Sequence, residues 1–384
     1  MPAMPEPHPS AASSTDAPAA APNPARATTA LPDAVPHRYE AFVAGLPKAE
    51  LHVHHVGSAS PRIVAELAAR HPKAGVPADE AKLAEYFTFT DFAHFITVYL
   101  SVVDLIRDAE DVRTLTYGVA ENMHAQGIRY AELTVTPYSH IHRGIPGEAF
   151  MEAIEDARLA AERDLGLVLR WCFDISGESG IPAADVTLDA ATRLAPAGLV
   201  SFGLGGPEIG VGRPQFKPHF DAARATGLHS VPHAGETTGP ETIWDALNSL
   251  GAERIGHGTS ATRDPDLLAH LAERQIPLEV CPTSNIATRA VATLAEHPLA
   301  DMVAAGCLVT VNSDDPPMFA TDLNREYAVA ADLLDLDEHG IAALAKNAVT
   351  ASFAPEDVKA RLTAEIDDHL TTWTSTSAGD RATR

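Results

Sequence analysis

The sequence predicts a single α/β domain, a (β/α)8 TIM barrel with extra helices near the first βα loop and at the C-terminus. Eight short runs of apolar or alternating residues are separated by segments with helical periodicity, and an unbroken strand–helix alternation is typical of one barrel rather than two domains. In addition, polar residues gather at the ends of five of the eight runs, and four of these ends carry histidines or acidic residues. The loops that follow the strands of a barrel meet at one mouth, so these side chains are expected to lie together.

The eight expected strands are short and rich in apolar residues. They comprise residues 49–54, 128–135, 167–175, 199–203, 229–233, 254–255, 277–281 and 308–312. Helical patterns lie between them, for example at residues 60–69, 109–126, 149–165, 216–225, 240–250, 265–274 and 298–305. Further helices from about Leu323 to Thr372 are expected to close the fold.

The two ends of the chain differ in composition from the barrel. Residues 1–35 are rich in Ala and Pro and carry almost no large apolar side chains, so we expect a disordered segment there. Residues 375–384 are expected to form a frayed tail, which leaves residues 36–374 for the barrel. Residues 83–106 are rich in aromatic side chains, and both core packing and an apolar lid over the mouth explain them.

The charge balance limits the partners of the protein. The sequence has 52 acidic and 28 basic residues, a formal net charge of −24, which disfavours binding to nucleic acid or an anionic membrane. No apolar run approaches a membrane span, and no basic region followed by an apolar stretch marks a signal peptide. The three cysteines show no CxxC pattern and fit a reducing compartment. We therefore expect a cytoplasmic protein with a small-molecule substrate; its oligomeric state stays open.

The first expected strand ends in half of a metal site. His52 and His54 are two residues apart, so their side chains point to the same side of a strand. His233 follows the fifth strand, and Asp314 follows the eighth. Three histidines and an aspartate suit Zn²⁺ and leave one coordination position for water.

Three other polar residues at the same strand ends have the chemistry of a hydrolase. Glu236 follows the fifth strand, and a carboxyl group in a partly desolvated pocket can hold a proton and act as an acid. His257 follows the sixth strand and is able to take a proton from water or orient it. Asp315, next to Asp314, adds a second carboxylate for hydrogen bonding.

Five motifs together resemble the adenosine deaminase family of the amidohydrolase superfamily. They are Pro47-Lys48-Ala49-Glu50-Leu51-His52-Val53-His54, His233-Ala234-Gly235-Glu236, Arg254-Ile255-Gly256-His257-Gly258, Cys281-Pro282-Thr283-Ser284-Asn285 and Asn312-Ser313-Asp314-Asp315-Pro316. The resemblance runs from about residue 45 to residue 355. It implies a barrel with one zinc ion per chain and hydrolytic removal of the 6-amino group of a purine, with release of ammonia.

The resemblance also implies a role for each matching residue. The implied zinc ligands are His52, His54, His233 and Asp314. Glu236 would protonate the purine N1 atom, and His257 would orient and deprotonate the water. Asp315 would hydrogen-bond to the water and to the purine ring. Gly206, after the fourth strand, aligns with a glycine whose backbone faces the base.

The first motif departs from the family at Val56. Adenosine deaminases usually have an aspartate there, which contacts the ribose 5′-hydroxyl, and a buried acceptor discriminates against substrates that lack its donor. We expect Val56 to give an apolar contact instead, which favours an adenine nucleoside with a bulky or apolar 5′ group. Within the family, His55-Val56-Gly57-Ser58 looks like the aminodeoxyfutalosine deaminases of menaquinone biosynthesis, which implies conversion of 6-amino-6-deoxyfutalosine to futalosine.

Three alternatives stay open at this point. The first is an adenosine or adenine deaminase of purine salvage, and the second is another hydrolysis on the same metal barrel. The absence of a lysine near residues 199–203 disfavours the two-metal branch of the superfamily. The third is a zinc-binding protein without activity, which the presence of both Glu236 and His257 disfavours.

Overall fold

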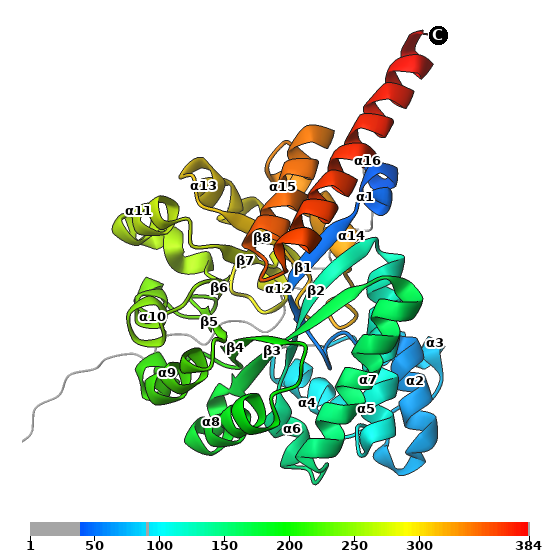
Figure 1. Cartoon of the computed structure of the whole chain (residues 1–384), viewed down its shortest axis with the longest axis vertical. Coiled ribbons are helices and arrows are strands. Elements are labelled where there is room, and N and C mark those ends of the chain that lie inside the picture. The colour runs from blue at the N-terminus through cyan, green and yellow to red at the C-terminus, as the bar shows by residue number, and fades with distance from the viewer. Residues whose placement is uncertain (1–38, 90–91, 383–384) are drawn as a thin grey trace, which may run out of the picture. The chain divides into compact units, whose positions relative to one another are not determined.

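The computed structural model describes residues 39–89 and 92–382, so the segment expected to be disordered lies outside the described residues. The described chain forms one eight-stranded parallel sheet in the order β1 to β8, surrounded by helices (Figure 1). The strands are β1 (Lys48–His54), β2 (Ile128–Val135), β3 (Val168–Ser176), β4 (Leu199–Gly205), β5 (His229–Ala234), β6 (Ile255–His257), β7 (Leu278–Val280) and β8 (Val309–Val311). All eight expected strands are confirmed, with ends that differ by at most two residues.

The barrel closes between its last and first strands just past β8. Asp314 forms an isolated parallel bridge with Val53. The backbone N–H of His54 donates to the carbonyl of Asp314 at 2.8 Å, and the N–H of Asp314 donates to the carbonyl of His52 at 3.1 Å. A barrel without free strand edges has every interior position enclosed, so β1 and the segment after β8 are held in fixed register.

The helices follow the expected pattern and alternate with the strands. They are α1 (Glu40–Gly45), α2 (Pro61–Arg70), α3 (Glu80–Tyr86), α4 (Phe92–Val103), α5 (Ala109–Ala125), α6 (Pro137–Ile141), α7 (Gly147–Leu165), α8 (Gly180–Asp189), α9 (Lys217–Ala225), α10 (Pro240–Asp245), α11 (Pro265–Arg274), α12 (Pro282–Ala287), α13 (Leu299–Ala304), α14 (Leu323–Leu333), α15 (Glu338–Ala351) and α16 (Glu356–Ala382). The carboxylates of Asp108 and Asp264 cap α5 and α11 by accepting from free backbone N–H groups of the first turn. The extra helices α2, α3 and α4 lie in the first βα connection, as expected.

The C-terminal helix is longer than the sequence indicates. A frayed tail is expected from Ser375, but α16 continues to Ala382. No proline interrupts this stretch, and the hydroxyls of Thr374 and Ser375 donate to carbonyls one turn earlier at 2.9 and 2.8 Å. Bonds of this kind, from a hydroxyl to the carbonyl four residues earlier, are how Ser and Thr side chains are accommodated inside a helix. None of the helices in the described ranges is both long enough and apolar enough to cross a bilayer.

A buried charge network ties the interior of the barrel together. The guanidinium of Arg254, 1% exposed, donates to Glu279 on β7 at 2.6 Å and also to Glu132 on β2. It donates a third bond to the carbonyl of Ala351 at 3.0 Å and lies 3.9 Å from the ring centroid of Phe353. A buried charge is costly unless it is paired and hydrogen-bonded, and here each guanidinium nitrogen has a partner.

Candidate active site

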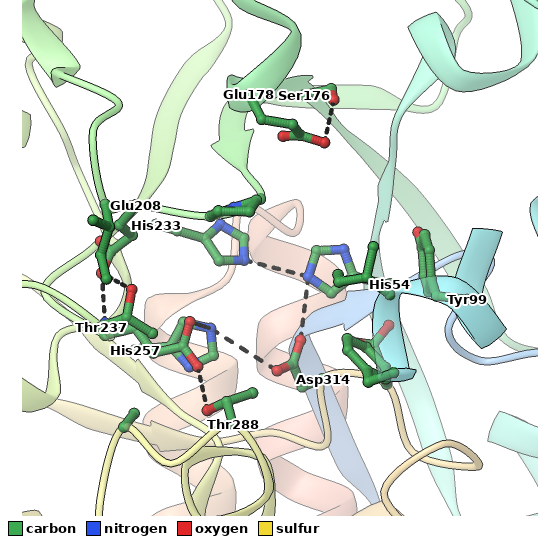
Figure 2. Close-up of a pocket in the computed structure, with 18 of the residues that line it drawn as sticks. His54, Tyr99, Ser176, Glu178, Glu208, His233, Thr237, His257, Thr288 and Asp314 are labelled. Atoms are coloured by element: carbon green, nitrogen blue, oxygen red, sulfur yellow. Dashed lines mark hydrogen bonds and ion pairs between the residues drawn. The ribbon is translucent and has the colours of Figure 1, made fainter. Parts of the chain in front are cut away.

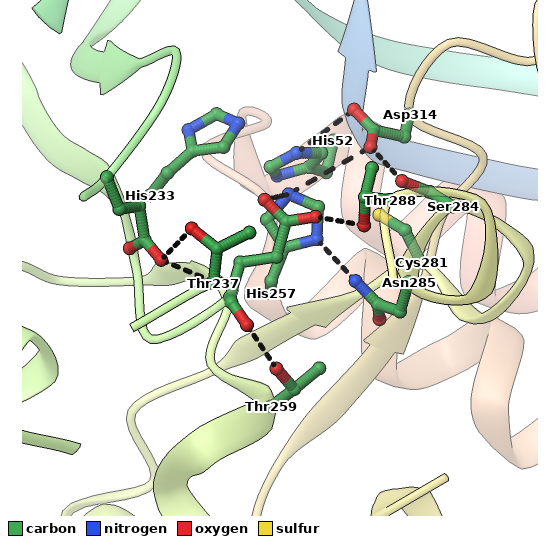
Figure 3. A network of polar contacts seen from close by, with 12 residues as sticks. His52, His233, Thr237, His257, Thr259, Cys281, Ser284, Asn285, Thr288 and Asp314 are labelled. Atoms are coloured by element: carbon green, nitrogen blue, oxygen red, sulfur yellow. Dashed lines mark hydrogen bonds and ion pairs between the residues drawn. The ribbon is translucent and has the colours of Figure 1, made fainter. Parts of the chain in front are cut away.

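The four expected metal ligands converge at the C-terminal mouth of the barrel. His52 and His54 come from the end of β1, His233 from β5 and Asp314 from the turn after β8 (Figures 2 and 3). The Nε2 atom of His54 lies 3.3 Å from Nε2 of His233 and 3.2 Å from Oδ1 of Asp314. The Nε2 atom of His52 lies 3.6 Å from the same carboxylate oxygen. The strand ends therefore bring together side chains that are up to 262 residues apart, counted from 52 to 314.

The spacing of these atoms fits a tetrahedral metal ion. Bonds of about 2.0–2.1 Å to a tetrahedral Zn²⁺ place neighbouring ligand atoms about 3.3 Å apart, close to the separations above. The buried Nε2 atom of His52 has no hydrogen-bond partner among the described residues, as is expected of an atom that binds a metal. The donor set of imidazoles and a carboxylate also suits zinc.

The charges around the cluster favour a cation. Burial lowers the pKa of His52, but the nearby carboxylates of Asp314 and Glu279 outweigh burial and raise it to about 10. Burial likewise lowers the pKa of His54, and the charges of Asp315 and Asp314 raise it to about 9. Both shifts show that the carboxylates attract positive charge to this position.

Neighbouring side chains hold the ligands in place. Nδ1 of His52 contacts Glu279 at 2.9 Å, and Glu279 is in turn held by Arg254. Ser284 Oγ donates to Asp314 Oδ2 at 2.5 Å. Asp314 has a φ angle of +64°, which is unfavourable for a residue with a side chain. The bridge to β1 and the bond from Ser284 hold Asp314 in this conformation.

Glu236 and His257 lie beside the cluster, as predicted. Glu236 accepts a bond from Thr288 Oγ1 at 2.8 Å, and its other oxygen is 3.7 Å from His257 Nε2. Burial raises the pKa of Glu236 to about 8, so the carboxyl group holds a proton at neutral pH. Burial lowers the pKa of His257 to about 3, which keeps the imidazole neutral. Asn285 Nδ2 lies 3.1 Å from Nδ1 of His257 and orients the ring.

Asp315 and Gly206 line the same cavity. Asp315 is 7% exposed, and its Oδ1 atom has no hydrogen-bond partner among the described residues. Its carboxylate occupies space that only a glycine at position 57 leaves free, because a Cβ there would lie 1.5 Å from Oδ1. Oδ1 thus packs against Gly57, while the Asp315 side chain as a whole lines the cavity.

Val56 does not lie where the sequence interpretation places it. Its side chain is 5% exposed and packs in the hydrophobic core, and it is absent from the residues that line the cavity. His54, at the end of β1, lines the cavity, whereas Val56, in the following turn, packs in the hydrophobic core. A direct contact between Val56 and a substrate in this cavity is therefore not expected from the structure.

One buried ion pair at the site was not predicted. Glu208, 3% exposed, accepts from the backbone N–H groups of Thr237 and Thr238 at 2.6 and 3.1 Å. It also pairs with Arg213 at 3.0 Å, and Arg213 donates to the carbonyl of His233 at 2.8 Å. The pair fixes the β5 loop that carries Glu236. In the sequence, the only sign of this ion pair is that Glu208 follows closely after the fourth strand.

The cavity above the cluster has a volume of about 630 Å³. One wall is apolar: α4 contributes Phe95, Ile96 and Tyr99, and Phe319 adds a ring whose centroid is 5.1 Å from that of Phe95. Phe95 therefore packs in the core and lines the cavity, so both explanations of the aromatic segment apply to it. The opposite wall is polar and comes from β3 and the loop after β4.

Comparison with known proteins agrees with this geometry. A model of the family described as "Adenosine deaminase" matches residues 47–369. The chain belongs to the adenosine deaminase family. It is 71% identical over 334 residues to an aminodeoxyfutalosine deaminase of Streptomyces avermitilis, covering 86% of this chain and 93% of the relative. It is 70% identical over 341 residues to the aminodeoxyfutalosine deaminase of Streptomyces coelicolor, covering 88% of each chain. The protein is thus a deaminase, a hydrolase of this family.

Two solved structures share the fold. An adenine deaminase from Arthrobacter aurescens superposes with a TM-score of 0.79 at 32% identity, covering 86% of this chain and 99% of the other. An amidohydrolase from Burkholderia ambifaria, solved with bound Zn, has a TM-score of 0.81 at 22% identity, covering 91% of this chain and 97% of the other. The second likeness supports the fold alone. Both confirm the predicted barrel fold.

We expect Glu279→Gln to weaken metal binding. Carboxylates that hold a ligating histidine contribute about 10–100-fold to metal affinity, and the change removes the charge while it keeps the shape. Competition of the purified protein with a zinc chelator measures the dissociation constant, with Glu241→Gln on the exposed surface as the matched control. An unchanged dissociation constant in Glu279→Gln would contradict the role given to this contact.

Proposed function

We propose that the protein is a zinc-dependent deaminase that converts 6-amino-6-deoxyfutalosine to futalosine and ammonia in menaquinone biosynthesis. The observation that carries the proposal is the 70–71% identity, over most of the chain, to two relatives named for this reaction. The site supports it, since acid, base and metal-binding groups line one cavity. One zinc ion per chain is proposed, held by His52, His54, His233 and Asp314.

The residues of the chain account for the proton transfers of deamination. Bound zinc supplies Lewis acidity and makes water easier to deprotonate. Protonated Glu236 donates its proton to N1 of the purine, which makes C6 electrophilic. Neutral His257 accepts the proton of the attacking water, and Asp315 accepts a hydrogen bond and orients the ring. His257 passes this proton to the amino group, the C6–N bond breaks, and ammonia leaves. The remaining proton of the C6 hydroxyl goes to the Glu236 carboxylate, so the product carries an oxo group at C6 and a proton on N1.

The shape of the cavity supports a nucleoside with an extended 5′ group. Its volume of about 630 Å³ lies within the range of cavities that bury drug-sized ligands, about 300–1,000 Å³. The aromatic wall of Phe95, Tyr99 and Phe319 offers an apolar surface beyond the reacting end. We propose that this wall, rather than Val56, receives the 5′ substituent. A small-molecule substrate also agrees with the net charge of −24, which disfavours nucleic acid and anionic membranes. A cytoplasmic location remains part of the proposal.

A second candidate is an adenosine or adenine deaminase of purine salvage. The Arthrobacter structure with 32% identity is an adenine deaminase, and the same acid, base and metal ligands would serve a free base. The two candidates differ only in what fills the cavity beyond the purine ring.

A comparison of substrates tests the proposal directly. We expect kcat/KM for 6-amino-6-deoxyfutalosine to exceed that for adenosine and for adenine by at least about tenfold, because only the extended nucleoside reaches the aromatic wall. Absorbance at the purine band and ammonia release measure each rate. A preference for adenosine or adenine would overturn the proposal in favour of purine salvage.

Glu236→Gln tests the assignment of the acid. Loss of a general acid lowers the rate by about 10²–10⁴-fold, so we expect kcat to fall by at least about 100-fold while the zinc content stays unchanged. Steady-state assays and metal analysis measure both quantities, and Glu241→Gln is again the control. Activity near that of the wild type in Glu236→Gln would show that another group protonates the ring.

A further inference from the structure

Two carboxylates on the polar wall of the cavity have no role in the chemistry described above. Asp174, near the end of β3, is 4% exposed, and Glu178 lies in the turn after β3. Both line the cavity. In Figure 2, Glu178 and Ser176 lie at the end of the cavity away from His257 and Thr288. The two carboxylates thus flank the reacting centre without belonging to it.

Each carboxylate is held by one oxygen and presents the other. Thr136 Oγ1 donates to Asp174 Oδ1 at 2.6 Å, and Ser176 Oγ donates to Glu178 Oε1 at 2.9 Å. No other described side chain donates a hydrogen bond to Asp174 Oδ2 or Glu178 Oε2. Because Asp174 lines the cavity, its second oxygen is open to a donor from a bound molecule.

Both free oxygens lie close to the backbone at the end of β4. A Cβ on Gly205 would lie 2.5 Å from Asp174 Oδ2, and a Cβ on Gly206 would lie 2.3 Å from Glu178 Oε2. The carboxylates therefore lie against two successive glycines, at the backbone that is expected to face the base. No third metal-ligating side chain joins them among the described residues, which favours a neutral donor over a cation.

The order of the strands sets the direction of a bound nucleoside. With C6 at the proposed metal ligands and N1 at Glu236 just after β5, the N3 edge points toward the neighbouring strand β4, which Gly206 follows. In the anti conformation of a purine nucleoside, C2′ lies on the N3 side of the ring and C5′ lies on the C8 side. The 2′- and 3′-hydroxyls then face β3 and β4, while the 5′ chain points toward α4 and Phe319.

We propose that Asp174 and Glu178 form a subsite for the ribose 2′,3′-diol, in which each free oxygen accepts a hydrogen bond from a sugar hydroxyl. Bonds from a hydroxyl to a carboxylate are among the strong ones. A site built to bind a hydroxyl strongly rejects a substrate that lacks it, because its acceptor stays unpaired. The subsite, which rests on the proposed function, selects ribonucleosides over deoxyribonucleosides and over free adenine.

The test compares substrates that differ by one hydroxyl. We expect kcat/KM of the wild type to fall by about 10–100-fold when 6-amino-6-deoxyfutalosine is replaced by its 2′-deoxy or 3′-deoxy analogue. Glu178→Leu, a change at an exposed side chain, and Asp174→Asn should lower activity on the ribonucleoside. In each variant, the fall in kcat/KM on going from the ribonucleoside to at least one of its two deoxy analogues should be less than about threefold. Asp185→Asn on α8, outside this cavity, should behave as the wild type.

The possible results distinguish a failure of the diol subsite from a failure of the proposed function. Equal kcat/KM of the wild type on the ribonucleoside and on both deoxy analogues would overturn the subsite and leave the proposed function intact. An unchanged penalty for both missing hydroxyls in Glu178→Leu and in Asp174→Asn would also overturn it. A wild type that deaminates adenine but no nucleoside would overturn the proposed function as well.

Discussion

The backbone pairing of Asp314 with β1 is the constraint on which the site depends. Its N–H and carbonyl groups bond to the backbone of His52 and His54, so one contact closes the barrel and brings three of the four proposed metal ligands together. The positive φ of Asp314 is the cost of turning its carboxylate inward at this closure. Stability of the barrel and geometry of the metal site are therefore not separable here.

Buried ion pairs lie beneath the site and hold its side chains. Glu132, Arg254 and Glu279 form a buried chain that ends on Nδ1 of His52, which leaves Nε2 of that ring free to face the cluster. On the other side of the mouth, the pair of Glu208 and Arg213 holds the loop of Glu236. His52 and the loop of Glu236 are thus each held by a buried ion pair that lies outside the cluster itself.

The sequence predicted the fold and the reacting groups because both have local signals. Strand ends followed by histidines and acids indicate where a barrel collects its chemistry, and all eight strands, Glu236 and Asp315 lie as expected. Val56 could not be placed, because the direction of a side chain in a turn depends on tertiary packing. Glu208, Asp174 and Glu178 were not identified either, since their role depends on side chains from other strands. The length of α16 was missed because a Ser/Thr-rich composition is typical of a tail, although no proline interrupts this stretch.

The central claim is that one metal ion is bound by His52, His54, His233 and Asp314. A crystal structure of the zinc-loaded protein with anomalous data collected at the zinc absorption edge tests it most directly. The account predicts a single peak at the mouth of the barrel, about 2.0–2.2 Å from Nε2 of each of the three histidines and from an oxygen of Asp314. A peak bound by His257 or Cys281 in place of one of these ligands, or a second peak in the cavity, would contradict it.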